Sequence, residues 1–180
     1  MLKCARLHVN AVGVRIKRTY AIQYAKTFKV NVTAVCSSKN FDIVKSLGAD
    51  QVIDYTKDDF TKRPEKYDLI FDTVGRIKLV KWKKSLKPDG IFLYCGSPSM
   101  GIIRFMLRVM FNRFRKKKIK FLIAKANPGD FTFLAKLMAD GKLKSIIDKS
   151  YPLPEIVKAH QLYDSHRTVG KVVVTVSHAQ

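Results

Sequence analysis

Short apolar runs rich in β-branched residues alternate with helical patterns along most of this chain, and this alternation constrains the fold more than any other feature. The expected strands are Arg6–Asn10, Asn31–Cys36, Gln51–Asp54, Tyr67–Asp72, Ile91–Tyr94, Ile119–Ile123 and Lys171–Val176. Strands that are separated by helices need crossover connections, and these produce a parallel sheet covered by helices on both faces. The sequence therefore predicts an α/β fold with a doubly wound parallel sheet.

The segments between these runs have apolar residues at helical spacing. The expected helices are Thr19–Phe28, Phe41–Leu47, Arg76–Leu86, Met100–Phe114, Asp130–Asp140 and Glu155–Tyr163, with turns at Lys87–Gly90 and Tyr151–Pro154. Gly48 and Gly141 stand where glycine commonly follows a helix end, and Asp130 is expected to cap the helix that it begins. The pattern indicates one domain with a full core.

A doubly wound sheet binds its ligand beyond the carboxyl ends of its strands, where the strand order reverses. Function is therefore expected in the segments that follow the strands. These segments are Asn10–Lys17, Cys36–Asn40, Asp54–Tyr55, Asp72–Gly75 and Cys95–Ser97.

Charge and cysteine content limit the class of partner. The 35 Lys and Arg residues exceed the 14 Asp and Glu residues, which gives a formal net charge of +21. Such a field favours ligands that carry phosphate, which include dinucleotides, nucleic acids and anionic lipids. The three cysteines are scattered, with no CxxC pair, so neither a metal site nor a disulfide framework is indicated. We expect a cytoplasmic protein.

Several segments together resemble the cofactor domain of the medium-chain dehydrogenase/reductase superfamily. They are AIQYAK (Ala21–Lys26), VTAVCSSKN (Val32–Asn40), LGADQVIDY (Leu47–Tyr55), YDLIFDTVG (Tyr67–Gly75), KPDGIFLYCG (Lys87–Gly96) and the tail Ala139–Val176. The closest branch is that of the zinc-independent quinone oxidoreductase-like reductases. The resemblance implies a Rossmann-type domain over residues 1–140 and a tail over 141–180, which in the family packs back on a catalytic domain.

Two departures from the family accompany this resemblance. The family's catalytic domain precedes the first strand, and no counterpart is present in this sequence, so we expect a truncated or degenerate form. The glycine-rich loop of the family is replaced by Asn10–Arg18, in which only Gly13 is a glycine. Its bulky neighbours Val14 and Ile16 are expected to obstruct a pyrophosphate that glycines would admit. We therefore expect oxidoreductase ancestry, with the activity of this chain alone in question.

The resemblance also assigns cofactor residues. Ser37, Ser38 and Lys39 follow the second strand, where enzymes that prefer NAD carry an acid, so NADP(H) is favoured over NAD(H). Tyr55 matches a tyrosine that the family uses at the adenosine phosphate. Backbone groups at two further strand ends are expected to line the nicotinamide, and these are Asp72, Thr73, Val74, Gly75, Cys95, Gly96 and Ser97. No catalytic side chain and no metal are assigned.

The basic segment Arg104–Lys120 allows several interpretations. The family position favours a solvated helix face that leads to Ile119–Ile123, an edge strand through which a second copy of the chain pairs. Contact with an anionic membrane or with nucleic acid is the alternative. Three hypotheses therefore remain open. One is an NADPH-dependent oxidoreductase of the quinone or enone type, and the second is a non-catalytic module that binds nucleotide or nucleic acid. The third is a defective fragment with no independent function.

Overall fold

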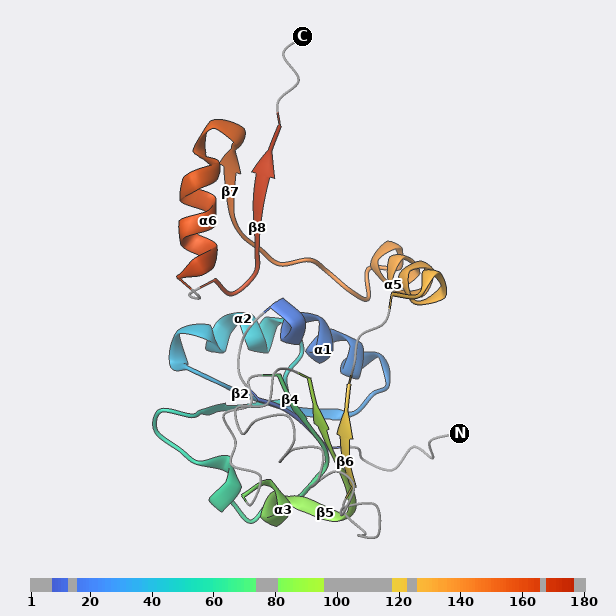
Figure 1. The fold of residues 1–180 in the computed structure, drawn as a ribbon. Helices are drawn as coiled ribbons and strands as arrows, with labels where there is room; N and C mark the ends of the chain where they lie inside the picture. Colours follow the sequence, from blue (N-terminus) through green and yellow to red (C-terminus); the bar gives the residue numbers. More distant parts are fainter. Residues whose placement is uncertain are drawn as a thin grey trace.

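The structure, a computed structural model of the chain, describes residues 8–12, 16–73, 81–95, 118–122, 126–165 and 168–176. The described strands form a six-stranded sheet and a separate two-stranded sheet (Figure 1). The first sheet contains β1 (His8–Val12), β2 (Asn31–Cys36), β3 (Gln51–Asp54), β4 (Tyr67–Asp72), β5 (Leu86–Tyr94) and β6 (Lys118–Phe121). The second contains β7 (Ile147–Pro152) and β8 (Lys171–Thr175).

All neighbouring strands of the larger sheet are parallel, in the order β3-β2-β1-β4-β5-β6. This order confirms the prediction of a doubly wound parallel sheet. The chain builds outward from β1 to β3 in one direction and then returns to the other side of β1 to add β4 to β6. The strand order therefore reverses between β1 and β4.

The helices cover both faces of this sheet, because α1 and α2 lie on one face and α3 on the other (Figure 1). The described helices are α1 (Ile16–Thr27), α2 (Phe41–Ser46), α3 (Trp82–Ser85), α5 (Pro128–Ala139) and α6 (Ile156–Asp164), with 3-10 turns η1 (Ser38–Asn40), η2 (Phe60–Lys62) and η4 (Leu153–Glu155). Gly48 follows α2 at φ +97° and Gly141 follows α5 at φ +70°, as expected of glycines that end helices.

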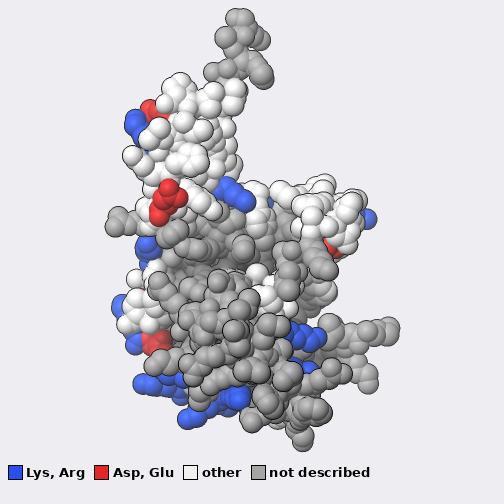
Figure 2. All heavy atoms as spheres, viewed as in Figure 1, with Lys and Arg blue, Asp and Glu red and all other residues white. Residues whose placement is uncertain are grey.

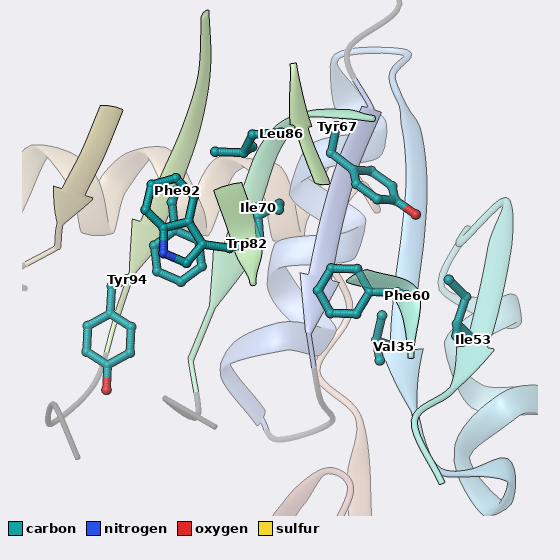
Figure 3. Close-up of a cluster of buried hydrophobic side chains, with 9 residues drawn as sticks. All are labelled: Val35, Ile53, Phe60, Tyr67, Ile70, Trp82, Leu86, Phe92 and Tyr94. Carbon is teal, nitrogen blue, oxygen red and sulfur yellow. The ribbon is translucent and has the colours of Figure 1, made fainter. Parts of the chain in front are cut away.

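Each face of the sheet has its own buried cluster. Strand β2 contributes to both, because alternate side chains of a strand point to opposite faces. Under α1 and α2 the cluster is aliphatic and consists of Ile22, Val32, Ala34, Cys36, Val44 and Ala49. On the other face it is largely aromatic and consists of Val35, Ile53, Phe60, Tyr67, Ile70, Trp82, Leu86, Phe92 and Tyr94 (Figure 3). Trp82 and Phe92 stack there with ring centroids 4.9 Å apart.

The fifth strand begins earlier than predicted. We expected a helix to Leu86 and a turn at Lys87–Gly90, but Leu86 already pairs with Tyr67. Regular pairing resumes where Ile91 meets Leu69, so the chain takes up extra residues as an irregularity inside β5. Gly90 permits this, because an added Cβ would lie 3.0 Å from the Tyr67 carbonyl oxygen. The part of the expected helix within 74–80 lies outside the described residues.

Two local predictions near the carboxyl end of the chain were also wrong. Helix α5 is capped by Asn127, whose side chain accepts a hydrogen bond from the Gly129 amide at 3.0 Å, whereas Asp130 lies in the first turn. Proline at the first helical position starts the helix earlier than the acidic residue suggested. The turn expected from Tyr151 begins later, because Tyr151 pairs within β7. The expected helix Met100–Phe114 lies outside the described residues.

One buried glutamine joins helix α1 to the segment that leads to the smaller sheet. Gln23 of α1 accepts a hydrogen bond from the Lys144 amide at 2.7 Å and donates to the Lys144 carbonyl at 3.0 Å. It also donates to the carbonyl of Thr19, and nearby the hydroxyls of Tyr20 and Ser145 share a hydrogen bond. The Gln23 side chain therefore satisfies both the backbone N–H and the backbone C=O of Lys144.

We predict that Gln23→Ala lowers the free energy of unfolding by about 1–3 kcal/mol, because the polar groups of Lys144 lose their partner in a partly buried place. Urea denaturation followed by circular dichroism measures the change. Gln161→Ala, in the exposed face of α6, is the matched control and should change stability little. Equal changes in the free energy of unfolding for the two substitutions would show that the hydrogen bonds to Lys144 do not contribute to stability.

Candidate functional site

The reversal of strand order places the candidate site at the carboxyl ends of the strands on either side of β1. Val12, at the end of β1, is in register with Val35 of β2 and with Asp72 of β4. Neighbouring strands lie about 4.8 Å apart, so the ends of β2 and β4 are about 10 Å from each other. An extended ligand can therefore contact both ends, as in other doubly wound sheets.

The ends of β2 and β3 bring one group of predicted residues together. Cys36 pairs with Asp54, and the Tyr55 amide donates to the Cys36 carbonyl at 3.2 Å. Ser37, Ser38 and Lys39 follow at once, so they lie at the same edge as Tyr55. Ser37 is half-buried, Ser38 and Lys39 are exposed, and 53% of Tyr55 is accessible. Two hydroxyls, a phenol and an ammonium group thus lie at this edge.

Asn40 is a residue of this group that the sequence analysis did not single out. It is buried, and its side-chain amide donates to the Ser37 hydroxyl oxygen at 3.1 Å. Its backbone amide donates to the Ser37 carbonyl at 3.0 Å. An asparagine just before a helix is ordinarily interpreted as a cap, but this side chain makes no capping bond to α2. Its position in the sequence predicts only that a helix begins after it. Nothing in the sequence indicates its hydrogen bond to Ser37.

Asp54 organises the turn that presents Tyr55. Its Oδ1 accepts hydrogen bonds from the Thr56 hydroxyl at 2.7 Å and from the Thr56 amide at 2.9 Å. These two bonds are the main reason that the pKa of Asp54 lies below its usual value, and the Ser38 hydroxyl and the charge of Lys57 lower it further. Oδ1 of Asp54 is thus engaged by Thr56, whereas the buried Oδ2 has no hydrogen-bond partner among the described residues.

The ends of β4 and β5 bring a second group of predicted residues together. Asp72 is buried and in register with Tyr94, and the Cys95 amide donates to the Asp72 carbonyl at 2.8 Å. Thr73 and Cys95 are half-buried. Burial raises the pKa of Tyr94, and the negative charge of Asp72 raises it further. The predicted Gly13, Val74, Gly75, Gly96 and Ser97 lie outside the described residues.

No group of three or more His, Cys, Asp and Glu side chains that could hold a metal ion occurs in the part of the chain that the structure describes. Among the helices of that same part, none has the length and apolar character needed to cross a membrane.

Comparisons with known proteins agree with this architecture. Residues 47–174 match the sequence model of a family described as zinc-binding dehydrogenase. The chain is 34% identical over 161 residues to the chloroplastic quinone-oxidoreductase QR1 of Triphysaria versicolor, covering 86% of this chain and 48% of that protein. It is 30% identical over 146 residues to the chloroplastic NADPH-dependent alkenal/one oxidoreductase of Arabidopsis thaliana, covering 79% and 33%.

A solved structure agrees as well. The fold superposes on the quinone oxidoreductase from Coxiella burnetii with a TM-score of 0.77 at 26% identity, covering 94% of this chain and 53% of the other. The chain spans about half the length of the quinone oxidoreductases that it matches.

We predict that Asp54→Asn makes the protein less stable at neutral pH and that the difference from the wild type shrinks in acid. A lowered folded-state pKa adds stability that is fully present above the ordinary value of 3.8 and is lost as pH falls through the folded pKa. Urea denaturation at pH values on both sides of 3.8 measures the difference. Asp89→Asn, at an exposed carboxylate of β5, is the control. A pH-independent difference for Asp54→Asn would contradict the prediction.

Proposed function

This chain belongs to the zinc-binding dehydrogenase family, in the quinone oxidoreductase-like branch of the medium-chain dehydrogenase/reductase superfamily, and from that membership we propose that its larger sheet binds NADP(H) for a reductase of quinone or enone type. One observation carries the proposal. The end of β2, where an NAD-preferring site needs an acid, presents Ser37, Ser38 and Lys39 instead.

The residues at this edge fit a phosphorylated ribose. A phosphate is a hydrogen-bond acceptor that carries negative charge, and hydroxyl and ammonium donors complement it. Asp54 ends the neighbouring strand β3, with its Oδ1 bonded to Thr56 and its Oδ2 buried, so it is not presented to ribose hydroxyls as a free acid would be. Tyr55 lies at the same edge with an exposed ring, where it can flank the adenosine.

The proposed path of the cofactor continues across β1 to the second group. Gly13 is the proposed contact for the pyrophosphate. The backbone after β4 and β5 is proposed to line the nicotinamide, from Asp72 to Gly75 and from Cys95 to Ser97. When bound, the nicotinamide supplies the hydride, and this chain's residues contribute binding and orientation. The quinone or enone substrate is proposed from the names of the relatives, which are an oxidoreductase of quinones and one of alkenals and alkenones.

Three further points belong to the same proposal. The tail is proposed to begin near residue 141, since the larger sheet is complete before α5 and the smaller sheet lies wholly after that position. A cytoplasmic location is proposed from the scattered thiols, although the two plant relatives are named as chloroplastic. A pairing of two copies through β6 is proposed because β6 is the last of the described strands at its edge of the sheet.

A second function is supported by a separate surface. Lys62, Lys66, Lys81 and Lys84 are exposed, and Figure 2 shows basic side chains beside η2 and α3. Lys66 precedes β4 and donates to the Lys84 carbonyl just before β5, so these lysines lie at the amino ends of the strands. This edge is opposite the proposed cofactor site. It suits a non-catalytic module that binds phosphates of a nucleic acid.

We predict that NADPH binds more tightly than NADH and that Lys39→Ala weakens NADPH binding about tenfold while NADH binding changes little, because a charge-assisted contact to the extra phosphate is lost. Cofactor fluorescence during titration at about 0.15 M salt gives both affinities, since that salt limits non-specific attraction.

Lys45→Ala removes an equal charge from the exposed face of α2 and is the matched control for this titration. Equal affinity for the two cofactors would contradict the NADP(H) proposal. Salt-sensitive binding of an RNA oligomer without dinucleotide binding would favour the second function.

We predict that the dimer fraction rises with salt concentration. Ile119 and Phe121 face the aromatic cluster, whereas Lys118 and Lys120 are exposed on the opposite face. Antiparallel pairing of two β6 strands would bring these lysines together, and salt screens their repulsion. Light scattering after size exclusion measures the fraction, and Lys120→Gln should reduce its dependence on salt. A monomer at all salt concentrations would contradict pairing through β6.

A further inference from the structure

The two adjacent serines at the end of β2 have different surroundings. Ser38 is exposed, and its hydroxyl contributes to lowering the pKa of Asp54. Ser37 is half-buried, and its hydroxyl oxygen accepts a hydrogen bond from the side chain of Asn40. Ser37 therefore has a fixed hydrogen-bond partner in Asn40, whereas the Ser38 side chain is exposed.

The bond from Asn40 determines what Ser37 can still do. A serine hydroxyl has one hydrogen to donate and two lone pairs with which to accept. Because Asn40 donates to the oxygen, the Ser37 hydrogen stays available, and none of the described residues accepts it. Asn40 itself is 6% exposed and is held to the Ser37 carbonyl by its own backbone amide. Burial and the backbone bond therefore fix the position of Asn40, and its side-chain amide bonds to Ser37 through Nδ2, while Oδ1 has no partner among the described residues.

We propose that Asn40 is a positioning residue for cofactor selection, because it keeps the Ser37 hydroxyl oriented as a donor towards the 2′-phosphate of NADPH. This inference rests on the proposed function. Asn40 is too buried to contact the ligand, so it acts through Ser37. A phosphate only accepts hydrogen bonds from such a donor, whereas the 2′-hydroxyl of NADH can rotate to donate or accept. A fixed donor therefore favours the phosphate.

The test compares adenosine 2′,5′-bisphosphate with adenosine 5′-monophosphate by calorimetric titration. These probes carry the adenosine end of each cofactor and do not extend across the β1 turn, so they isolate the pocket after β2. For the wild type we expect the bisphosphate to bind more tightly. For Ser37→Ala and Asn40→Ala we expect a loss of about tenfold for the bisphosphate and less than about twofold for the monophosphate.

The double variant Ser37→Ala/Asn40→Ala should be no weaker than either single variant, since the two residues act through one hydroxyl. Ser46→Ala, at an exposed serine of α2 outside the proposed site, is the matched control, and it should preserve the ratio of the two affinities. An equal loss for both probes in Asn40→Ala, additive losses in the double variant, or a ratio lowered equally by Ser46→Ala would overturn the role of Asn40.

Asn40→Asp covers the case in which the alanine variant fails to fold. It keeps the shape of the side chain but offers only acceptors and carries a negative charge that should weaken both probes. It should also turn the Ser37 hydrogen away from the ligand, and so lower the ratio of bisphosphate to monophosphate affinity more than Asn40→Ala does. Unchanged selectivity in Asn40→Asp would overturn the inference. A wild type without preference for the bisphosphate would overturn the NADP(H) proposal and this inference together, whereas a wild-type preference that survives in the variants overturns the inference alone.

Discussion

The parallel pairing of β1 with both β2 and β4 is the interaction on which the rest of the structure depends. It brings the ends of β2 and β4 to one edge of the sheet, although the two strands lie far apart in the sequence. The registers of the outer strands then fix the remaining groups, because Cys36 meets Asp54 and Asp72 meets Tyr94. A shift of the register by one residue would turn every side chain of a strand to the other face of the sheet. The registers that bury the two clusters are therefore the same registers that bring the site residues together.

The two faces of the sheet support this edge differently. The aliphatic cluster reaches Cys36, the last residue of β2, so the serines after it start from a buried anchor. The aromatic cluster extends through Phe92 to Tyr94 and supports the end of β5. Both faces of the central strands are covered, so a ligand reaches this sheet at the ends of its strands. Loops on a buried scaffold commonly carry binding residues, and the proposed contacts lie in the loops after β2 to β5.

The alternation of apolar runs was enough to predict the sheet, since the bounds of β2, β3 and β4 agree with the sequence pattern. The predicted start of α5 was wrong because an acidic residue can either cap a helix or lie in its first turn. Asp130 resembles a cap, but Asn127 and Pro128 begin the helix first. The sequence predicted that the site lies at the strand ends, and the structure brings Ser37 and Tyr55 to one edge of the sheet. The roles of Asn40 and Asp54 depend on contacts across a turn, and no periodicity in the sequence reports such contacts.

Net charge and selectivity act over different distances in this protein. A formal charge of +21 attracts every phosphate, so it raises the encounter rate of NADPH, of NADH and of nucleic acid alike. Salt screens that attraction over about 8–10 Å, whereas a donor in contact with a phosphate oxygen is affected much less. Discrimination between two dinucleotides therefore has to come from a few oriented groups. The Ser37 hydroxyl, which we propose is held as a donor by the buried side chain of Asn40, would supply such a group.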